Sequence, residues 1–413
     1  MGQPADGGLF MPENLPQVDF ERYPEELPAL AKQLLAVFFE GDTLADDVAA
    51  MVDDTYAFPA PLIPMTHLGP AYLLELFHGP TASFKDFGAR FLASAWHRIH
   101  KADEAPVTVL VATSGDTGGA VAAAFHRRSF ARVVLMFPDG RVSPLQERQL
   151  TCWGDNVTSL SVAGTFDDCQ RLAKMALADR ALRAKTQITT ANSINIGRLL
   201  PQMTYYAAAA WEHFRRKGEK LGFIVPTGNV GNVFAATVAR AVGFPIGSIC
   251  IATNANDVIP KFLAGSGEVA RPVSLSTLAN AMDVAAPSNL ERLSALYPNL
   301  KDFNAAIHAE AVSDDEILDE IRQTYDESGE IICPHTACGV RLLRRLRARG
   351  SMETFAVAAT AHPAKFPEVI AQALGGDIVV PMPPSLAAIL EKPVQMTPIP
   401  NDYDALQKAL LQK

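Results

Sequence analysis

One lysine, Lys85, lies in a segment where an amine would carry a positive charge only with difficulty. Ser83 is placed to cap a helix, with Asp86 three residues further on in the capping-box relation, so Lys85 falls in the first helical turn. The positive end of that helix and the flanking Phe84 and Phe87 favour the neutral amine, the form that attacks an aldehyde. We therefore predict that Lys85 carries a covalently held cofactor; this segment alone leaves open the alternative of a solvated helix-start lysine.

A glycine loop that could hold a phosphate follows the apolar strand expected at residues 223–227. Its glycines allow successive backbone N–H groups to point at one spot, and the helix expected at 233–242 adds its positive end. The loop has neither the lysine of a Walker loop nor the glycine spacing of a dinucleotide site, and an ordinary helix-start turn is the alternative. The residues predicted to bind the phosphate are Thr227, Gly228, Asn229, Val230, Gly231 and Asn232.

A second glycine loop follows the strand expected at 107–113 and opens a helix expected at 120–128. Its hydroxyls and backbone donors suit a carboxylate, whereas Asp116 is out of place in an anion site. We expect Asp116 to face a donor such as a ring hydroxyl, an amine or a neighbouring side chain, with a plain helix-capping role as the alternative. The candidate ligands in this loop are Thr113, Ser114, Asp116 and Thr117.

Two further segments carry polar groups suited to a binding pocket. Asn192, Ser193 and Arg198 combine an amide, a hydroxyl and a guanidinium within seven residues, and arginine can bind a phosphate through two parallel hydrogen bonds. A surface loop is the alternative for this segment. Thr360 ends an apolar strand, where its neutral hydroxyl could form a hydrogen bond with a pyridine nitrogen. Lys365 adds positive charge near the end of the same strand.

The composition favours a globular enzyme and argues against several kinds of partner. Of the 413 residues, 48% are hydrophobic and 20% are charged, which allows two or three well-filled domains. The net charge of -9 is spread without a basic stripe and no apolar stretch approaches a membrane span, so we expect neither nucleic acid nor a membrane as partner. Few, scattered cysteines and no signal-like start favour the cytoplasm. Cys333–Cys338 lacks the fourth ligand of a zinc site, so no metal is expected.

The order of the expected elements predicts an α/β fold. Leu27–Phe39 and Leu44–Ala57 carry apolar residues at helical spacing. From residue 107 onward, short apolar runs alternate with helical patterns, which signals parallel sheets covered by helices, with ligands bound beyond the carboxyl ends of the strands. The strands are expected at 107–113, 133–137, 223–227, 248–253 and 355–360, and a last short helix at 403–411.

Taken together, the lysine segment, the two glycine loops, the Asn/Arg segment and the strand-end threonine resemble the threonine synthase family of pyridoxal 5'-phosphate enzymes, in the fold type II superfamily. The resemblance spans most of the chain and includes Ala57–Pro61, Ala281–Val284 and Pro287–Asn289. Relatives usually begin with a short strand that would lie ahead of Met1. The resemblance implies two open, mostly parallel twisted sheet domains covered by helices: a helical prefix at 1–70, a large domain at 71–105 and 195–380, a small domain at 106–194, and a tail at 381–413.

The same resemblance implies roles for the candidate residues. Lys85 would carry pyridoxal 5'-phosphate, the loop at 227–232 would hold its phosphate, Thr360 would contact the ring nitrogen and Asp116 would lie near the ring hydroxyl. The residues implied to bind the substrate O-phospho-L-homoserine are Thr113, Ser114 and Thr117 for its amino acid part, Asn192, Ser193, Arg198 and Lys365 for its phosphate, and Asp283 in the same pocket.

The implied reaction converts O-phospho-L-homoserine and water to L-threonine and phosphate by γ-elimination and β-addition, the last step of threonine biosynthesis. Lys85 would move the protons, and the enzyme would be a monomer or a weak dimer. Two alternatives stay open. One is a phospholyase or hydroxyamino-acid dehydratase that releases a keto acid; the other is a non-catalytic protein that binds a metabolite.

Overall fold

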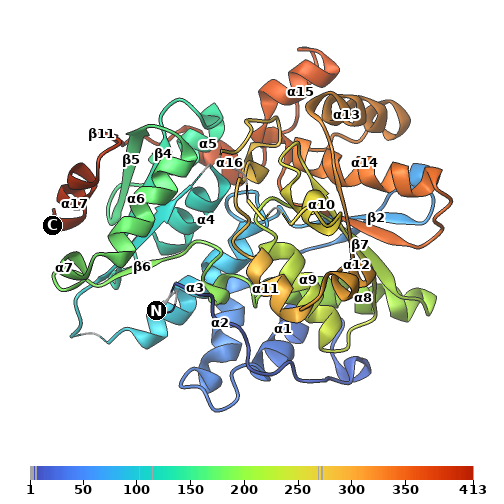
Figure 1. The fold of residues 1–413 in the computed structure, drawn as a ribbon, viewed down its shortest axis with the longest axis horizontal. Coiled ribbons are helices and arrows are strands. Elements are labelled where there is room, and N and C mark those ends of the chain that lie inside the picture. The colour runs from blue at the N-terminus through green and yellow to red at the C-terminus, as the bar shows by residue number, and fades with distance from the viewer. Residues whose placement is uncertain are drawn as a thin grey trace.

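Two mostly parallel sheets, each covered by helices, form the two halves of the molecule (Figure 1). The computed structural model describes residues 4, 7–101, 103–113, 115–267, 269–270 and 273–412. Among these residues, the single antiparallel pair of neighbouring strands is β1 with β2, and the other neighbours in both sheets run parallel. The predicted fold class is therefore confirmed.

The strand orders place the strands that carry the candidate loops inside their sheets. The six-stranded sheet consists, in spatial order, of β1 (Leu62–Pro64), β2 (Ala71–Glu75), β10 (Phe355–Ala359), β7 (Leu221–Pro226), β8 (Ile246–Thr253) and β9 (Ile307–Ala311). The five-stranded sheet consists of β11 (Thr397–Pro400), β5 (Val157–Ala163), β4 (Ala131–Pro138), β3 (Val107–Ala112) and β6 (Ile188–Thr190). Strands β3, β7 and β10 are buried along their whole length, as expected for parallel strands covered on both faces.

Helices cover both faces of both sheets (Figure 1). Those packed with the five-stranded sheet are α3 (Lys85–Ile99), α4 (Asp116–Phe125), α5 (Pro144–Thr151), α6 (Phe166–Ala178) and α17 (Tyr403–Leu411), with the short α7 (Arg180–Arg183) following α6. Those packed with the six-stranded sheet are α8 (Gln202–Lys217), α9 (Gly231–Ala241), α10 (Val258–Leu263), α12 (Leu300–Ala306), α13 (Asp314–Ser328), α14 (Pro334–Ala348) and α15 (Pro367–Leu374). The remaining helices are α1 (Leu27–Ala36), α2 (Val48–Thr55), α11 (Leu290–Leu296) and α16 (Pro384–Leu390).

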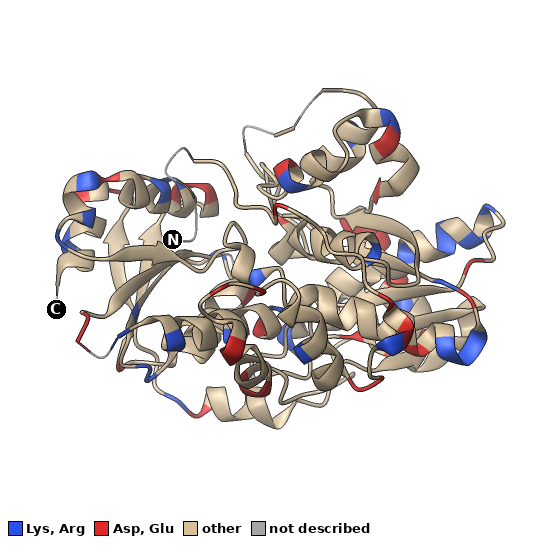
Figure 2. Cartoon of the chain, turned by 90° about the horizontal axis from the view of Figure 1, so that it is seen from below, with Lys and Arg blue, Asp and Glu red and all other residues tan. Residues whose placement is uncertain are grey.

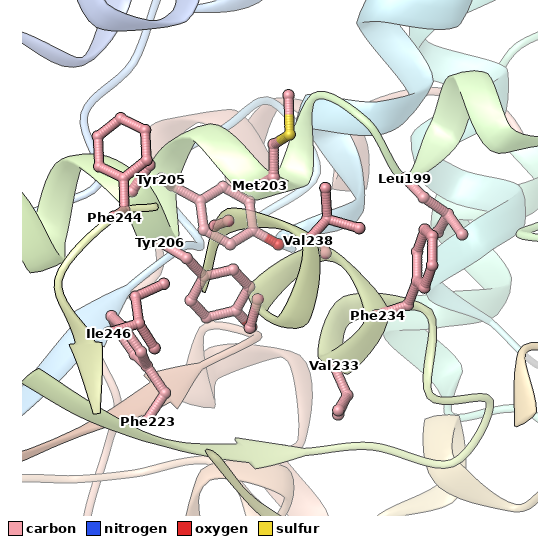
Figure 3. Packing of buried hydrophobic residues seen from close by; sticks show 14 of the residues in the cluster. Leu199, Met203, Tyr205, Tyr206, Phe223, Val233, Phe234, Val238, Phe244 and Ile246 are labelled. Atoms are coloured by element: carbon pink, nitrogen blue, oxygen red, sulfur yellow. The ribbon is translucent and has the colours of Figure 1, made fainter. Parts of the chain in front are cut away.

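The largest apolar core lies between α8, α9 and the six-stranded sheet (Figure 3). Tyr205 and Tyr206 of α8 are fully buried, and the Tyr206 ring lies edge-on to Phe223 of β7 with centroids 5.0 Å apart. Helix α1 packs on α8 and α2 packs on α3, so the helical prefix extends this core. The core thus holds rigid the start of α3, where Lys85 lies, and the start of α9, where the phosphate loop ends.

Most elements that the sequence predicts are present. All five expected strands form, with ends shifted by up to two residues, and the last helix spans Tyr403–Leu411 as expected. The two prefix helices also form, as α1 and α2. Strand β11, beyond residue 380, joins the five-stranded sheet next to β5. The domain boundaries expected at 70, 105, 194 and 380 stay a prediction.

Residues of both charge signs occur on the helices of both halves (Figure 2). In the described part of the chain, no helix has both the length and the apolar character needed to cross a membrane.

Candidate active site

The polar residues that follow β3, β7 and β10 meet in one pocket. Thr113, Thr227 and Thr360 come directly after these three strands, and all three line it. The loops at the carboxyl ends of these parallel strands therefore line one common pocket, as the sequence predicts. The other candidate residues that line the pocket are Lys85, Asp116, Thr117, Asn192, Ser193, Arg198, Gly228, Asn229, Gly231 and Asn232. Ser114 lies outside the described residues. Val230 belongs to the loop at 227–232, but it is buried and does not line the pocket.

Lys85 is the first residue of α3, but the predicted capping box is absent. Ser83 Oγ accepts only a long hydrogen bond from Lys85 N, at 3.4 Å. The carboxylate of Asp86 instead turns back to the preceding turn, where it accepts from Thr81 N at 2.9 Å and from Thr81 Oγ1 at 2.7 Å. The turn includes Ala82 with a φ of 52°, a conformation that costs a non-glycine residue energy. Asp86 therefore stabilises a strained turn that presents Lys85 to the pocket.

The surroundings of Lys85 favour its neutral form, as the sequence predicts. Burial lowers the pKa of its amine from 10.5 to about 8. The negative charge of Asp116 opposes this shift, whereas the positive charges of Lys365 and Arg198 add to it. A substantial fraction of the amine is therefore unprotonated near neutral pH, and so able to attack a carbonyl carbon.

The loop after β7 presents a set of unused backbone donors. Val230 has a φ of 50° and gives its N–H to Thr227 Oγ1 at 3.1 Å, while Asn232 Oδ1 accepts from Thr227 Oγ1 at 2.6 Å. These bonds fix the turn at the start of the 11-residue helix α9. Within the described residues, four N–H groups here have no protein acceptor, namely those of Gly228, Asn229, Gly231 and Asn232. Free donors at the positive end of a helix fit a phosphate dianion.

The end of η5 (Asn280–Met282) and the segment after it pack closely against this loop. A Cβ added to Gly228 would lie 2.5 Å from Met282 O and 2.8 Å from Met282 Cα, so only glycine fits there. Asn229 Oδ1 accepts from Ser288 N at 2.6 Å, and its carbonyl accepts from Asn289 Nδ2 at 3.1 Å. The loop's shape is thus set by residues about 60 positions away in the chain.

Ser193 joins the phosphate loop to the Asn192–Arg198 segment. Asn229 Nδ2 donates to Ser193 Oγ at 2.6 Å. Arg292 has no local sequence signal that marks it as functional. It is 1% exposed and donates from Nη1 to Ser193 O at 3.1 Å and to Asn289 Oδ1. Arg292 therefore joins the segment at 192–198 to the residues that hold the loop at 227–232. The predicted cofactor residues and substrate residues in these two segments form one continuous wall of the pocket.

Arg198 is available to an anion within this wall. Its side chain is 2% exposed and lies at the end of η4 (Ile196–Arg198). Nη1 donates to Ala191 O, whereas Nε has no hydrogen-bond partner among the described residues. Burial lowers its pKa to about 10, so the guanidinium stays charged at neutral pH. Asn192, in contrast, shapes the loop, since its Nδ2 donates to Ala112 O at 2.9 Å.

His335 and Thr360 supply neutral groups to the pocket. Burial lowers the pKa of His335 to about 4, and its Nε2 accepts from Ala281 N at 3.1 Å, so the ring is neutral and carries its proton on Nδ1. Thr360 is 5% exposed, and its hydroxyl makes no hydrogen bond with another described residue. A buried hydroxyl without a partner can donate a hydrogen bond to a ring nitrogen and leave that nitrogen uncharged.

Asp116 and Lys365 pair with each other at the base of the site. Lys365 Nζ lies 2.7 Å from Asp116 Oδ1, and the side chains are 0% and 4% exposed. Gln146 Nε2 also donates to Asp116 Oδ1, at 3.0 Å. Although burial opposes ionisation, the charges of Lys365 and Lys85 hold the pKa of Asp116 well below its usual value. Asp116 therefore faces an amine, one of the three kinds of donor expected for it.

Lys365 and Asp283 do not line the pocket, in contrast to the other candidates for substrate binding that the structure describes. The amine of Lys365 is committed to Asp116 and to Thr81 O. Asp283 accepts from Asn254 Nδ2 and from Thr277 Oγ1, both at 2.7 Å, and burial raises its pKa to about 7. The geometry supports a structural role for both side chains better than the predicted contact with substrate.

The fold and this site define a pyridoxal-phosphate-dependent enzyme of fold type II. A family model described as "Pyridoxal-phosphate dependent enzyme" matches residues 54–361, and one described as "Threonine synthase, C-terminal" matches 336–410. The chain belongs to the threonine synthase family. It is 38% identical to the threonine synthase of Serratia marcescens over 98% of this chain and 93% of that protein.

Solved structures agree with this assignment. The crystal structure of threonine synthase from Escherichia coli superposes with a TM-score of 0.89 at 35% identity, covering 99% of this chain and 94% of that one. The PLP-bound threonine synthase from Brucella melitensis gives 0.87 at 33% identity, with the same coverage. The cofactor is pyridoxal 5'-phosphate, and the free donors of the loop after β7, the neutral Thr360 hydroxyl and the Lys85 amine fit its phosphate, ring nitrogen and aldehyde.

Attachment of the cofactor is expected to depend on pH through Lys85. Because only the unprotonated amine attacks the aldehyde, the rate of cofactor attachment should rise as the pH passes through about 8 and then level off. Mixing the apoprotein with pyridoxal 5'-phosphate over a series of pH values and following the visible absorbance measures this rate. A rate that still climbs steeply near the pKa of an ordinary lysine, about 10.4, would contradict the account of Lys85 given above.

Proposed function

We propose that this enzyme converts O-phospho-L-homoserine and water to L-threonine and inorganic phosphate, the last step of threonine biosynthesis. The observation that carries the proposal is the presence of two anion-binding features in one wall: the donor loop at 227–232 and the buried Arg198, joined through Ser193. One feature suits the cofactor phosphate, which leaves the second for a substrate with a phosphate of its own. The match to the threonine synthase C-terminal family supports the same reaction.

Each part of the substrate has a proposed set of ligands. Ser193 and Arg198 bind the phosphate, with the charged guanidinium as the main attraction, while Asn192 shapes the loop that carries them. Backbone donors and hydroxyls of the loop from Thr113 to Thr117 bind the amino acid part, since Thr113, Asp116 and Thr117 line the same pocket as Lys85. Thr113 acts indirectly, because its Oγ1 accepts from Gly115 N at 3.0 Å and from Gly118 N at 2.9 Å and so shapes the loop. Lys365 and Asp283 support these ligands from outside the pocket.

We propose that the amine of Lys85 moves the protons of this reaction. As the general base it takes protons from Cα and Cβ of the substrate, and as the general acid it returns one to Cγ after the phosphate has left and one to Cα after water has added. The bound cofactor supplies an electron sink next to Cα. Water then adds at Cβ, so the atoms of substrate and water are conserved in threonine and phosphate. An amine with a pKa of about 8 suits both directions of transfer near neutral pH.

Product analysis tests the proposal. Incubating the holoenzyme with O-phospho-L-homoserine should yield threonine and inorganic phosphate in equal amounts, with little 2-oxobutyrate. Chromatography of the amino acids, a phosphate assay and a keto acid assay on the same samples measure all three. Phosphate released together with 2-oxobutyrate, and no threonine, would instead identify a lyase and contradict the proposed addition of water.

We also propose that the enzyme works in the cytoplasm, which the five free, buried cysteines support, since buried free thiols are typical of reducing compartments. The expectations of a monomer or weak dimer and of no nucleic acid partner stay predictions.

A further inference from the structure

The buried ion pair between Lys365 and Asp116 joins the two halves of the molecule beside Lys85. Lys365 ends η6 (Pro363–Lys365), which follows β10 of the six-stranded sheet, and Asp116 starts α4, which follows β3 of the five-stranded sheet. Besides its 2.7 Å contact with Asp116, Lys365 Nζ donates to Thr81 O at 2.9 Å. Thr81 belongs to the strained turn that carries Lys85, so one ammonium group contacts both the acid and the turn.

We propose that Lys365 is a positioning residue that balances the charge of Asp116 beside Lys85 and ties Asp116 to the turn from which Lys85 projects. The inference rests on the proposed role of Lys85 as the cofactor-bearing lysine, and it does not depend on the identity of the substrate. It gives Lys365 a function other than the phosphate contact expected from the sequence.

Charged groups that face Lys85 act on its proton in opposite directions. An unpaired carboxylate at Asp116 would attract a proton to the Lys85 nitrogen, whereas the ammonium of Lys365 repels one. The other titratable groups facing Lys85 are Arg198 of η4, which also repels a proton, and His335 of α14, which is neutral. Lys365 is thus the cation in direct contact with the carboxylate, and its removal would leave Asp116 without its cationic partner and only Arg198 to oppose its effect on Lys85.

The position of Lys365 is fixed from several sides. Asp86 holds the N–H and the hydroxyl of Thr81, and Gln149 Nε2 donates to the same Thr81 carbonyl as Lys365, at 3.0 Å. On the other side of the pair, Gln146 links Asp116 to Asn280, whose Nδ2 donates to Gln146 Oε1 at 3.0 Å. Gln149 thus braces one acceptor of the Lys365 ammonium, Thr81 O, and Gln146 braces the other, Asp116 Oδ1.

Four proteins test the inference in their cofactor-loaded form: the wild type, Lys365→Met, Asp116→Asn and the double variant. The pH midpoint of the cofactor's visible absorbance reports the proton on the Lys85 nitrogen. Removing Lys365 should raise this midpoint by about one pH unit or more, a tenfold change in proton affinity. Asp116→Asn should lower the midpoint, and the double variant should return toward the wild type, because a buried pair replaced on both sides leaves no lone charge.

Equal midpoints in the wild type and Lys365→Met would overturn the inference. If Lys365→Met does not fold, the effect of removing Lys365 is measured in the Asp116→Asn background instead. The double variant should then have a higher pH midpoint than Asp116→Asn. Equal midpoints in these two variants would again overturn the proposal. Lys301→Met, which removes an exposed lysine of α12, is the control and should leave the midpoint unchanged. A wild type without visible absorbance would count against the role of Lys85 itself, so the two failures are distinguishable.

Discussion

Replacing Lys85 with alanine is expected to abolish covalent attachment of the cofactor and to lower turnover by roughly 10²–10⁴-fold or more, the usual contribution of a positioned general acid and base. The same nitrogen serves as anchor and as proton carrier, so both functions are lost together. The visible absorbance of the protein after gel filtration measures attachment, and threonine formation measures turnover. Both should fall in the same variant.

The matched control is Lys217→Ala, which removes an exposed lysine at the end of α8. It should keep the absorbance and the rate of the wild type. A Lys85→Ala protein that retains cofactor through gel filtration and still forms threonine would show that another group carries the cofactor.

Replacing Gly228 with alanine is expected to weaken binding of the cofactor phosphate. The new methyl group would overlap the backbone of Met282, with 2.5 Å to its carbonyl oxygen, and backbone cannot rotate away as a side chain can. The loop or the segment above it must therefore shift, at a cost of about 1–3 kcal/mol, which corresponds to a roughly 5–150-fold higher dissociation constant. Titration of the apoprotein with pyridoxal 5'-phosphate measures that constant.

Gly376→Ala is the control for this change, because a Cβ at Gly376 has nothing within 4 Å and its backbone is not in the left-handed region. Its dissociation constant should equal that of the wild type. An unchanged constant for Gly228→Ala would mean that the loop after β7 does not hold the phosphate.

The elements with strong local signals could be predicted from the sequence. Buried parallel strands such as β3 and β7 are continuous apolar runs, and the glycine loops that follow them mark the ends where ligands bind. Of the described strands, the edge strands β1, β6, β9 and β11 and the interior strands β2 and β5 were missed. Strand β11 (Thr397–Pro400) contains two prolines and is mostly exposed, so its sequence has no strand pattern, and only its pairing with β5 makes it a strand.

The contacts within the site could not be predicted, because they join residues far apart in the chain. The capping-box spacing of Ser83 and Asp86 is real, yet Asp86 binds Thr81, since the turn at Ala82 offers it two donors. Similarly, nothing in the sequence near Lys365 indicates that its ion-pair partner is Asp116, which lies 249 positions earlier in the chain. Arg292 carried no local signal at all. The resemblance supplied roles, but the structure decides which side chains reach the pocket.

The most direct test of the account is to identify the lysine that holds the cofactor. Reduction of the holoenzyme with borohydride, followed by proteolysis and mass spectrometry, locates the pyridoxyl group on a peptide. We expect the pyridoxyl group on Lys85, at the start of α3. A pyridoxyl group on Lys365 or any other lysine, or none on the protein, would contradict this expectation.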